Sequence, residues 1–285
     1  MAFDELREAV RLLFRIPLLW IPGMVGGAFA AIIWLSFFYS GAFFTSRLLV
    51  IFALVLLFFT TGMLAVIRNN EATGRALLTG GLNNFFRVLL PQIVIFSVLI
   101  LVFILCTITF ALLGLTSDIG LLSALTFGIM MPTLMLTFFF DTAAVFEDRK
   151  VYESIQRSVL LVSNHMMEAL GYFIMSALLC AGVIFGLMIV WEAILFDKLK
   201  PLMDFTDAQR ETFTPDQLIA MIGQDGIWVT AIIIFIGVLI LLPLLFSYKA
   251  CFYKKMASHA VMIEQQTSGE YDSKGRWYKY RNFSF

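Results

Sequence analysis

The amino-acid sequence predicts an all-α integral membrane protein with six transmembrane helices. Three observations indicate this fold class: 60% of the 285 residues are hydrophobic, only 14% are charged, and six long stretches carry almost no charge. A soluble domain carries about 25% charged residues, and about 20 apolar residues cross a hydrocarbon layer of about 30 Å. The composition therefore places the chain among membrane proteins.

The six spans are expected at apolar runs bounded by charged or turn-forming residues. Pro132 is expected to kink the fourth span, because proline removes one backbone hydrogen bond. The predicted spans, in order, are residues 18–40, 48–67, 89–114, 121–146, 169–191 and 227–248.

An amphipathic segment precedes each pair of spans. Residues 2–15, 68–87 and 150–165 carry apolar side chains at helical spacing on one face, which is typical of a helix lying in the membrane interface. In the second segment, Gly80 and Gly81 are expected to break or bend the helix. In the third, the apolar stripe is Val151, Ile155, Val159, Val162 and Met166, and the face expected to meet water holds Lys150, Glu153, Ser154 and Arg157.

This order of one interfacial helix and two spans occurs three times. The repeats cover about 1–67, 68–147 and 148–253, which together form a six-span membrane domain, and a cytoplasmic tail follows at 254–285. Each unit begins on the same side of the membrane, so the repeats are parallel. Closure of the three hairpins around a pseudo-threefold axis is a hypothesis that follows from this pattern.

Lysine and arginine set the orientation in the membrane. Of the 20 such residues, 16 lie in four stretches, residues 2–15, 68–87, 149–166 and 249–285. The positive-inside rule therefore places both termini in the cytoplasm and the acidic loop 192–226 outside, with the protein in the cell membrane.

Two pairs of glycines spaced four apart are expected to be packing sites. These are Gly23 with Gly27 in the first span and Gly182 with Gly186 in the fifth. Small residues at this spacing allow a second helix to approach closely. The second helix could belong to the same chain or to a second copy.

Asp141 is the most informative carboxylate, because it lies within the fourth span. A charge at the centre of a span costs about 2.5–3.5 kcal/mol, and Asp141 lies about two turns from the end. One interpretation is an ion or proton site, or a polar contact within the bundle. The alternative is an interfacial carboxylate paired with Arg149, Arg87 or a helix N-terminus.

Four further polar residues are expected near the same membrane face: Glu147, Asp148, His165 and Glu168. Their spacing matches no strong metal-binding signature. The alternative to a metal site is a solvated, charged hinge where the fourth span stops, with the acids neutralised by Arg149 and Lys150. The sequence contains no GxGxxG, P-loop, GxSxG or HExxH motif, so it indicates no catalytic residue, cofactor or metal.

Membrane lipids are the expected partners, together with a protein partner or a second copy of the chain. The tail interleaves aromatic residues with Lys274, Arg276, Lys279 and Arg281, a pattern that favours anionic lipid, with a partner-docking peptide or a disordered segment as alternatives. The net charge is zero, so nothing indicates nucleic acid.

Two segments carry a resemblance: LREAVRLLFRIPLLWIPGM near the N-terminus and VFEDRKVYESIQRSVLLVSNHMMEALGYF after the fourth span. They resemble a loose group of uncharacterised prokaryotic, often archaeal, multi-pass proteins. That group is similar to the membrane domain of glycerophosphoryl diester phosphodiesterases. The sequence departs from it at Met166 and Met167, where an aromatic residue is usual. No phosphodiesterase domain follows the sixth span, so the resemblance implies no catalytic residue.

The leading hypothesis is a non-enzymatic polytopic membrane protein that acts by packing in the membrane or by binding a partner or lipid. One alternative is a transporter or channel for a small or lipidic substrate, in which Asp141 would line the path. The other is a membrane enzyme that acts on lipid headgroups through Glu147, Asp148 and His165.

Overall fold

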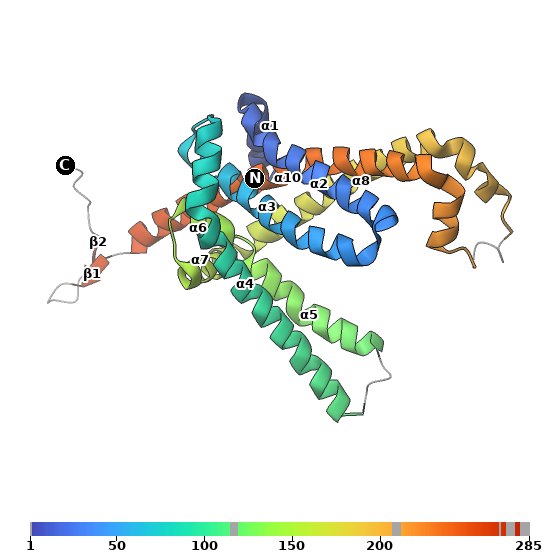
Figure 1. Ribbon diagram of the computed structural model, residues 1–285. Coiled ribbons are helices and arrows are strands. Elements are labelled where there is room, and N and C mark those ends of the chain that lie inside the picture. Colours follow the sequence, from blue (N-terminus) through green and yellow to red (C-terminus); the bar gives the residue numbers. More distant parts are fainter. Residues whose placement is uncertain (1, 115–118, 207–211, 268, 272–276, 280–285) are drawn as a thin grey trace. The chain divides into compact units, whose positions relative to one another are not determined.

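The protein is built from helices and one short pair of strands (Figure 1). The computed structural model describes residues 2–114, 119–206, 212–267, 269–271 and 277–279. Its elements are α1 (Ala2–Arg15), the 3-10 helix η1 (Pro17–Trp20), α2 (Ile21–Tyr39), α3 (Gly41–Asn69), α4 (Gly74–Leu112), α5 (Ile119–Thr137), α6 (Phe140–Phe146), α7 (Val151–Asn164), α8 (Met166–Leu199), the 3-10 helix η2 (Lys200–Asp204), α10 (Pro215–Thr267), β1 (Gly269–Tyr271) and β2 (Trp277–Lys279).

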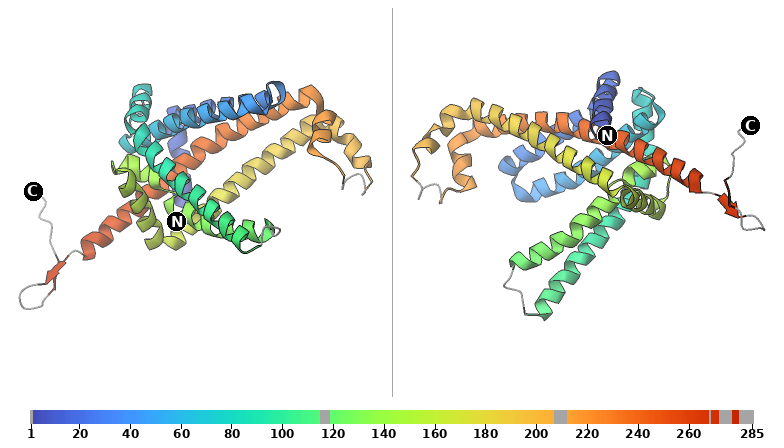
Figure 2. Two further views of the ribbon diagram at one scale, coloured as in Figure 1. Left: turned by 60° about the horizontal axis from the view of Figure 1, so that its bottom comes forward. Right: turned by 180° about the vertical axis from the view of Figure 1, so that it is seen from behind.

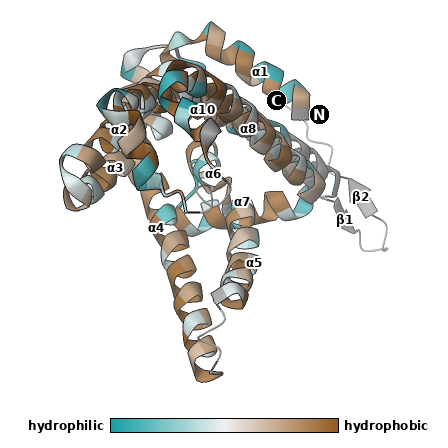
Figure 3. Ribbon diagram, turned by 90° about the vertical axis from the view of Figure 1, so that its right-hand side faces the viewer, coloured by the Kyte–Doolittle hydropathy of each residue, from teal (hydrophilic) through white to brown (hydrophobic). Residues whose placement is uncertain are grey.

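Within the described residues, six helical segments are long and apolar enough to cross a membrane, which confirms the predicted number. These segments are Pro17–Tyr39, Gly41–Asn69, Gly74–Leu112, Gly120–Phe146, Met166–Leu202 and Pro215–Ser258. Colouring by hydropathy shows the apolar residues along these helices (Figure 3).

Gly80 and Gly81 were expected to break or bend the helix; they do not break it, because α4 runs from Gly74 to Leu112 without interruption. A Cβ atom added at Gly81 would lie 2.9 Å from the carbonyl oxygen of Phe58 on α3. The glycine therefore serves the close approach of two helices, which no larger residue would allow.

The last helix extends beyond the predicted sixth span at both ends. It begins at Pro215 and bends at Gly223, whose φ of 63° and ψ of −167° lie in a region that glycine alone adopts easily. It then continues to Thr267. Residues 254–267, which were expected to begin the cytoplasmic tail, are therefore helical.

The described tail ends in the two strands, an addition to a chain expected to be all-α. β1 and β2 pair antiparallel, with Glu270 opposite Tyr278. The tail residues 272–276 and 280–285, including Lys274, Arg276 and Arg281, lie outside the described residues, as do residues 207–211 of the predicted outer loop.

The chain divides into two compact units, which are described separately. Unit 1 contains Met1–Leu6, Phe86–Leu170 and Lys249–Phe285, and unit 2 contains Arg7–Phe85 and Gly171–Tyr248. The three repeats and their pseudo-threefold closure stay predictions.

In unit 2, the first glycine pair packs within the chain. A Cβ atom at Gly23 would lie 2.6 Å from the carbonyl oxygen of Leu239, and one at Gly27 would lie 2.7 Å from that of Phe235. The backbones of α2 and α10 therefore approach as closely as the small residues predict. Trp34 on α2 also donates from Nε1 to the carbonyl oxygen of Ile227 at 3.0 Å.

The second glycine pair has different surroundings. Among the described residues, no heavy atom beyond the neighbouring helical turns lies within 4 Å of a Cβ built at Gly182 or Gly186. The contact of α8 with α10 uses larger side chains instead: Trp191 donates from Nε1 to the hydroxyl of Thr230 at 2.8 Å. The packing role predicted for Gly182 and Gly186 stays a prediction.

In unit 1, the C-terminal part of α4 and the antiparallel α5 form a helical hairpin (Figures 1 and 2). The buried residues of this part of α4 recur at helical spacing along one stripe, Ile95, Leu99, Cys106 and Phe110. Other side chains of the hairpin are exposed: Phe96 on α4 is 64% exposed and Phe127 on α5 is 65% exposed. Large exposed apolar side chains suit a surface that faces lipid.

The orientation of α7 differs from the predicted one. Its buried residues are Ser154, Ser158, Leu161 and Val162. Ser154 was expected to face water but is fully buried. A serine can lie on a buried face when its hydroxyl binds the backbone, and Ser154 donates to the carbonyl oxygen of Val151 at 2.8 Å.

Candidate functional site

The candidate site in unit 1 begins with an interruption of the fourth span. α5 ends at Thr137 and α6 begins at Phe140. α5 is continuous through Pro132, so the helix is interrupted beyond the proline and not at it. An interruption inside a membrane leaves backbone groups that need other partners.

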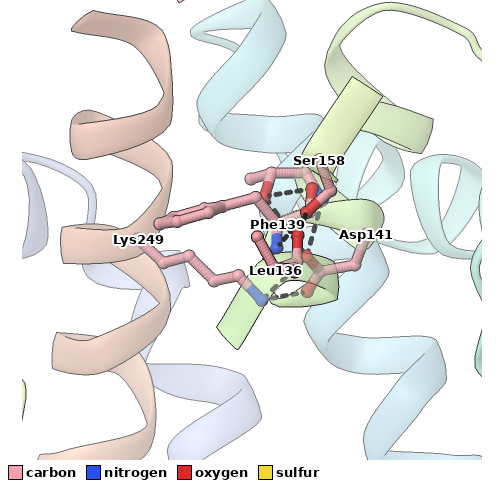
Figure 4. Close-up of polar contacts among 6 residues, drawn as sticks. Leu136, Phe139, Asp141, Ser158 and Lys249 are labelled. Carbon is pink, nitrogen blue, oxygen red and sulfur yellow. Dashed lines mark hydrogen bonds and ion pairs between the residues drawn. The ribbon is translucent and has the colours of Figure 1, made fainter. Parts of the chain in front are cut away.

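Ser158 of α7 supplies those partners (Figure 4). Its hydroxyl accepts a hydrogen bond from the backbone N–H of Phe139 at 3.0 Å and donates one to the carbonyl oxygen of Leu136 at 2.8 Å. One buried side chain thus satisfies a donor and an acceptor on either side of the interruption. The sequence signal was a serine directly before the apolar run at residues 159–162 of α7.

Asp141 lies in the first turn of α6 and binds Lys249 of α10 (Figure 4). The Lys249 ammonium donates to Oδ2 of Asp141 at 2.8 Å and lies equally close to Oδ1. Each residue is only 7% exposed. The ammonium also lies 4.0 Å from the centre of the Phe138 ring, a cation–π contact.

This partner was not among those that the sequence predicted for Asp141. Arg149 and Arg87 bind other carboxylates, and Lys249 lies one residue beyond the predicted end of the sixth span. α10 continues as a helix past Tyr248, which carries Lys249 to the level of Asp141. A single lysine directly after a long apolar run was the available signal.

Glu147 follows the end of the fourth span and accepts three hydrogen bonds. Its Oε1 accepts from Arg157 Nε at 3.0 Å and from the Tyr253 hydroxyl at 2.7 Å. Its Oε2 accepts from Arg149 Nε at 3.1 Å. The Glu147–Arg149 pair agrees with the predicted neutralised hinge, whereas Arg157 and Tyr253 were not predicted as partners.

Burial opposes ionisation of Glu147, but the hydrogen bonds from Tyr253 and Arg157 outweigh it and lower the pKa of Glu147. For Arg157, burial acts against the charge, and the hydrogen bond to Glu147 overcomes it and raises the pKa. Both groups are therefore charged at neutral pH, and this part of α7 is tied to the end of the fourth span.

Asp148 binds a different partner from its neighbour Glu147. Its carboxylate lies 2.5 Å from Arg87 of α4, and its φ of 53° places it in the left-handed region, which Asp tolerates better than most residues. The turn directs two adjacent acids to two different helices.

His165 and Glu168 form the last predicted pair, with Nδ1 of His165 4.0 Å from Oε2 of Glu168. In the part of the chain that the structure describes, no group of three His, Cys, Asp or Glu residues could hold a metal ion. The five predicted polar residues thus fall into separate contacts around Asp141, Glu147, Asp148 and the His165–Glu168 pair.

The sequence pattern of α1 did not predict one buried acid, Glu5. Glu5 is 3% exposed and binds Lys255 of α10. Glu5 belongs to an amphipathic helix, where an acid is ordinarily solvated, so the pattern gave no sign of burial.

Among the described residues, six helical segments are long and apolar enough to cross a membrane, which is compatible with a multi-pass membrane protein. Comparison with known proteins gave no match: no family model, no curated protein and no solved structure matches the chain.

Proposed function

We propose that this is a non-enzymatic, multi-pass membrane protein that acts by packing in the plane of the membrane and by binding lipid or a partner protein. The observation that supports this proposal most is that three acidic side chains form ion pairs between helices. Asp141, Glu147 and Asp148 each bind a cationic side chain of another element of unit 1. Their role in this arrangement is to hold helices together.

The geometry of Glu147 also bears on the enzyme alternative. Three donors surround its carboxylate and its pKa is lowered, which makes it a weak general base. Asp148 and His165, the other residues of that alternative, have separate partners. No specific observation favours chemistry on a lipid headgroup.

The proposal places the protein in the cell membrane with both termini in the cytoplasm, as the distribution of lysine and arginine indicates. α1 and α7 then lie in the cytoplasmic interface. Exposed apolar side chains on these helices, such as Phe3 at 71% and Tyr152 at 75%, support that placement.

A transporter is the second candidate, because an interrupted helix beside a buried ion pair is a common feature of transport sites. The test is a double variant, Asp141→Asn with Lys249→Met, which removes both charges and leaves no buried charge unpaired. In proteoliposomes, fluxes of protons, Na⁺ and K⁺ would be compared with those of the wild type. A flux that the double variant abolishes would favour transport over our proposal.

The main test is purification in native lipid followed by mass spectrometry of everything that is retained. A stoichiometric protein or a retained lipid class supports the proposal. Turnover of a lipid headgroup by the purified protein would contradict it, as would a small molecule that is bound and also moved across the membrane.

A further inference from the structure

Two arginine side chains converge on one acid at the end of the fourth apolar segment. Arg157 donates from Nε to one carboxylate oxygen of Glu147, and Arg149 donates from Nε to the other. The two Nε atoms are therefore at most about 8 Å apart, the length of two hydrogen bonds joined by a carboxylate. A single acidic side chain thus fixes two guanidinium groups beside each other.

The contacts through Nε leave a second edge of each arginine for another acceptor. A guanidinium has five N–H donors in a planar fork, and a partner bound at Nε does not occupy the edge between the two terminal nitrogens. The Arg149 side chain is 45% exposed and that of Arg157 is 19% exposed. The carboxylate itself is held from α10 by the Tyr253 hydroxyl.

The charge of this group favours an anion. Two arginines and one glutamate leave one net positive charge, and Lys254 lies on the same part of α10, 5.4 Å from the centre of the Phe146 ring. Arginine pairs suit phosphate, because the fork donates two parallel hydrogen bonds to its oxygens.

The two arginines lie at a position in the chain where lipid phosphates are expected. The apolar segment Gly120–Phe146 ends directly before Glu147, so the arginines follow the last residue that crosses the hydrocarbon layer. α7, which carries Arg157, also exposes apolar side chains such as Tyr152 at 75% and Leu160 at 48%. A phosphate beside exposed apolar groups is the arrangement that a phospholipid offers.

We propose that Arg149 and Arg157, held by Glu147, bind the phosphate group of an anionic phospholipid. This inference rests on the proposed function and names the class of lipid that it involves.

The test uses native mass spectrometry of the full chain in detergent, with phosphatidic acid or phosphatidylcholine added. The variant is Arg149→Gln, which removes the more exposed arginine and leaves the Glu147–Arg157 and Glu147–Tyr253 contacts. The matched control is Arg75→Gln, which makes the same change at an exposed arginine of unit 2. Thermal unfolding of each variant confirms that it is folded.

We expect Arg149→Gln to weaken phosphatidic acid binding roughly tenfold, or about 1.4 kcal/mol, since it removes charge-assisted hydrogen bonds to the phosphate. Arg75→Gln should leave it unchanged, and phosphatidylcholine should bind more weakly to the wild type. Competition by inorganic phosphate at equal concentration would support the phosphate site but assign it to a soluble ligand and not to a lipid.

Equal effects of the two variants would overturn the inference, because they would mark a general response to charge. Undiminished binding to Arg149→Gln would overturn it as well. Neither result would contradict the proposed function if the native-lipid purification still yields a stoichiometric partner or another lipid class.

Discussion

The ammonium of Lys249 lies 2.8 Å from the carboxylate of Asp141, although 108 residues separate them in the chain. Both side chains are buried, and the pair joins α6 to α10 within unit 1. Because the two charges cancel, neither residue needs water at this depth.

Removing one partner of this pair should destabilise the protein far more than removing both. We expect Asp141→Asn and Lys249→Met each to cost about 3–5 kcal/mol, since each leaves the other group buried without its partner. The double variant should recover most of that loss. Reversible unfolding in mixed micelles measures all three, and additive single effects would show that the pair is not coupled.

Stability should fall in acid partly through Glu147. Its pKa in the folded protein is below the ordinary value of 4.5, so its ionised form stabilises the fold above that pH. As the pH falls through the folded pKa, the carboxylate is protonated and this stabilisation is lost. Unfolding measured between pH 7 and pH 3 should therefore depend less on pH in Glu147→Gln than in the wild type. Parallel curves would contradict the assignment.

Ser158→Ala should loosen the interruption between α5 and α6. We expect a loss of about 3 kcal/mol, because two buried backbone groups lose their partner and each such group costs about 1–3 kcal/mol. Hydrogen exchange at the Phe139 amide should become faster. The control is Ser163→Ala on an exposed position of α7, which should change stability by less than about 0.5 kcal/mol.

The two glycine pairs should respond to alanine in opposite directions. At Gly27 a new Cβ would lie 2.7 Å from a backbone oxygen of α10, so Gly27→Ala should cost about 1–3 kcal/mol. At Gly182 no described atom restricts the added methyl, and Gly182→Ala should stabilise α8 by about 0.5–1 kcal/mol. Thermal unfolding compares them. A destabilising Gly182→Ala would instead indicate that another helix covers this face.

Several features of the fold were readable from local sequence. The number of spans follows from the length of each uncharged run, because every residue of such a run favours lipid whatever its neighbours are. The close contact at Gly23 and Gly27 follows from side-chain size. Gly80 and Gly81 were expected to break or bend a helix; the helix is not broken there, and Gly81 lies at a close helix contact.

The sequence predicted the candidate site only in part. Asp141 stood out because a carboxylate within a span is costly. Arg149 and Lys150 were expected to neutralise Glu147 and Asp148; Arg149 does bind Glu147, whereas Asp148 binds Arg87. Lys249, Tyr253 and Lys255 were not predicted as partners, since all three belong to the helical extension of α10 beyond the predicted end of the sixth span.

The sequence by itself determined that the chain has six apolar helices, because burial in lipid depends on composition within one segment. Only the tertiary structure decided which charges meet. Asp141, Glu147 and Asp148 lie within eight residues of one another, yet they bind Lys249, Arg157 and Arg87 on three different helices. Ion pairs form only between side chains a few ångströms apart, and the pattern of the sequence does not indicate which helices, distant in the chain, come that close.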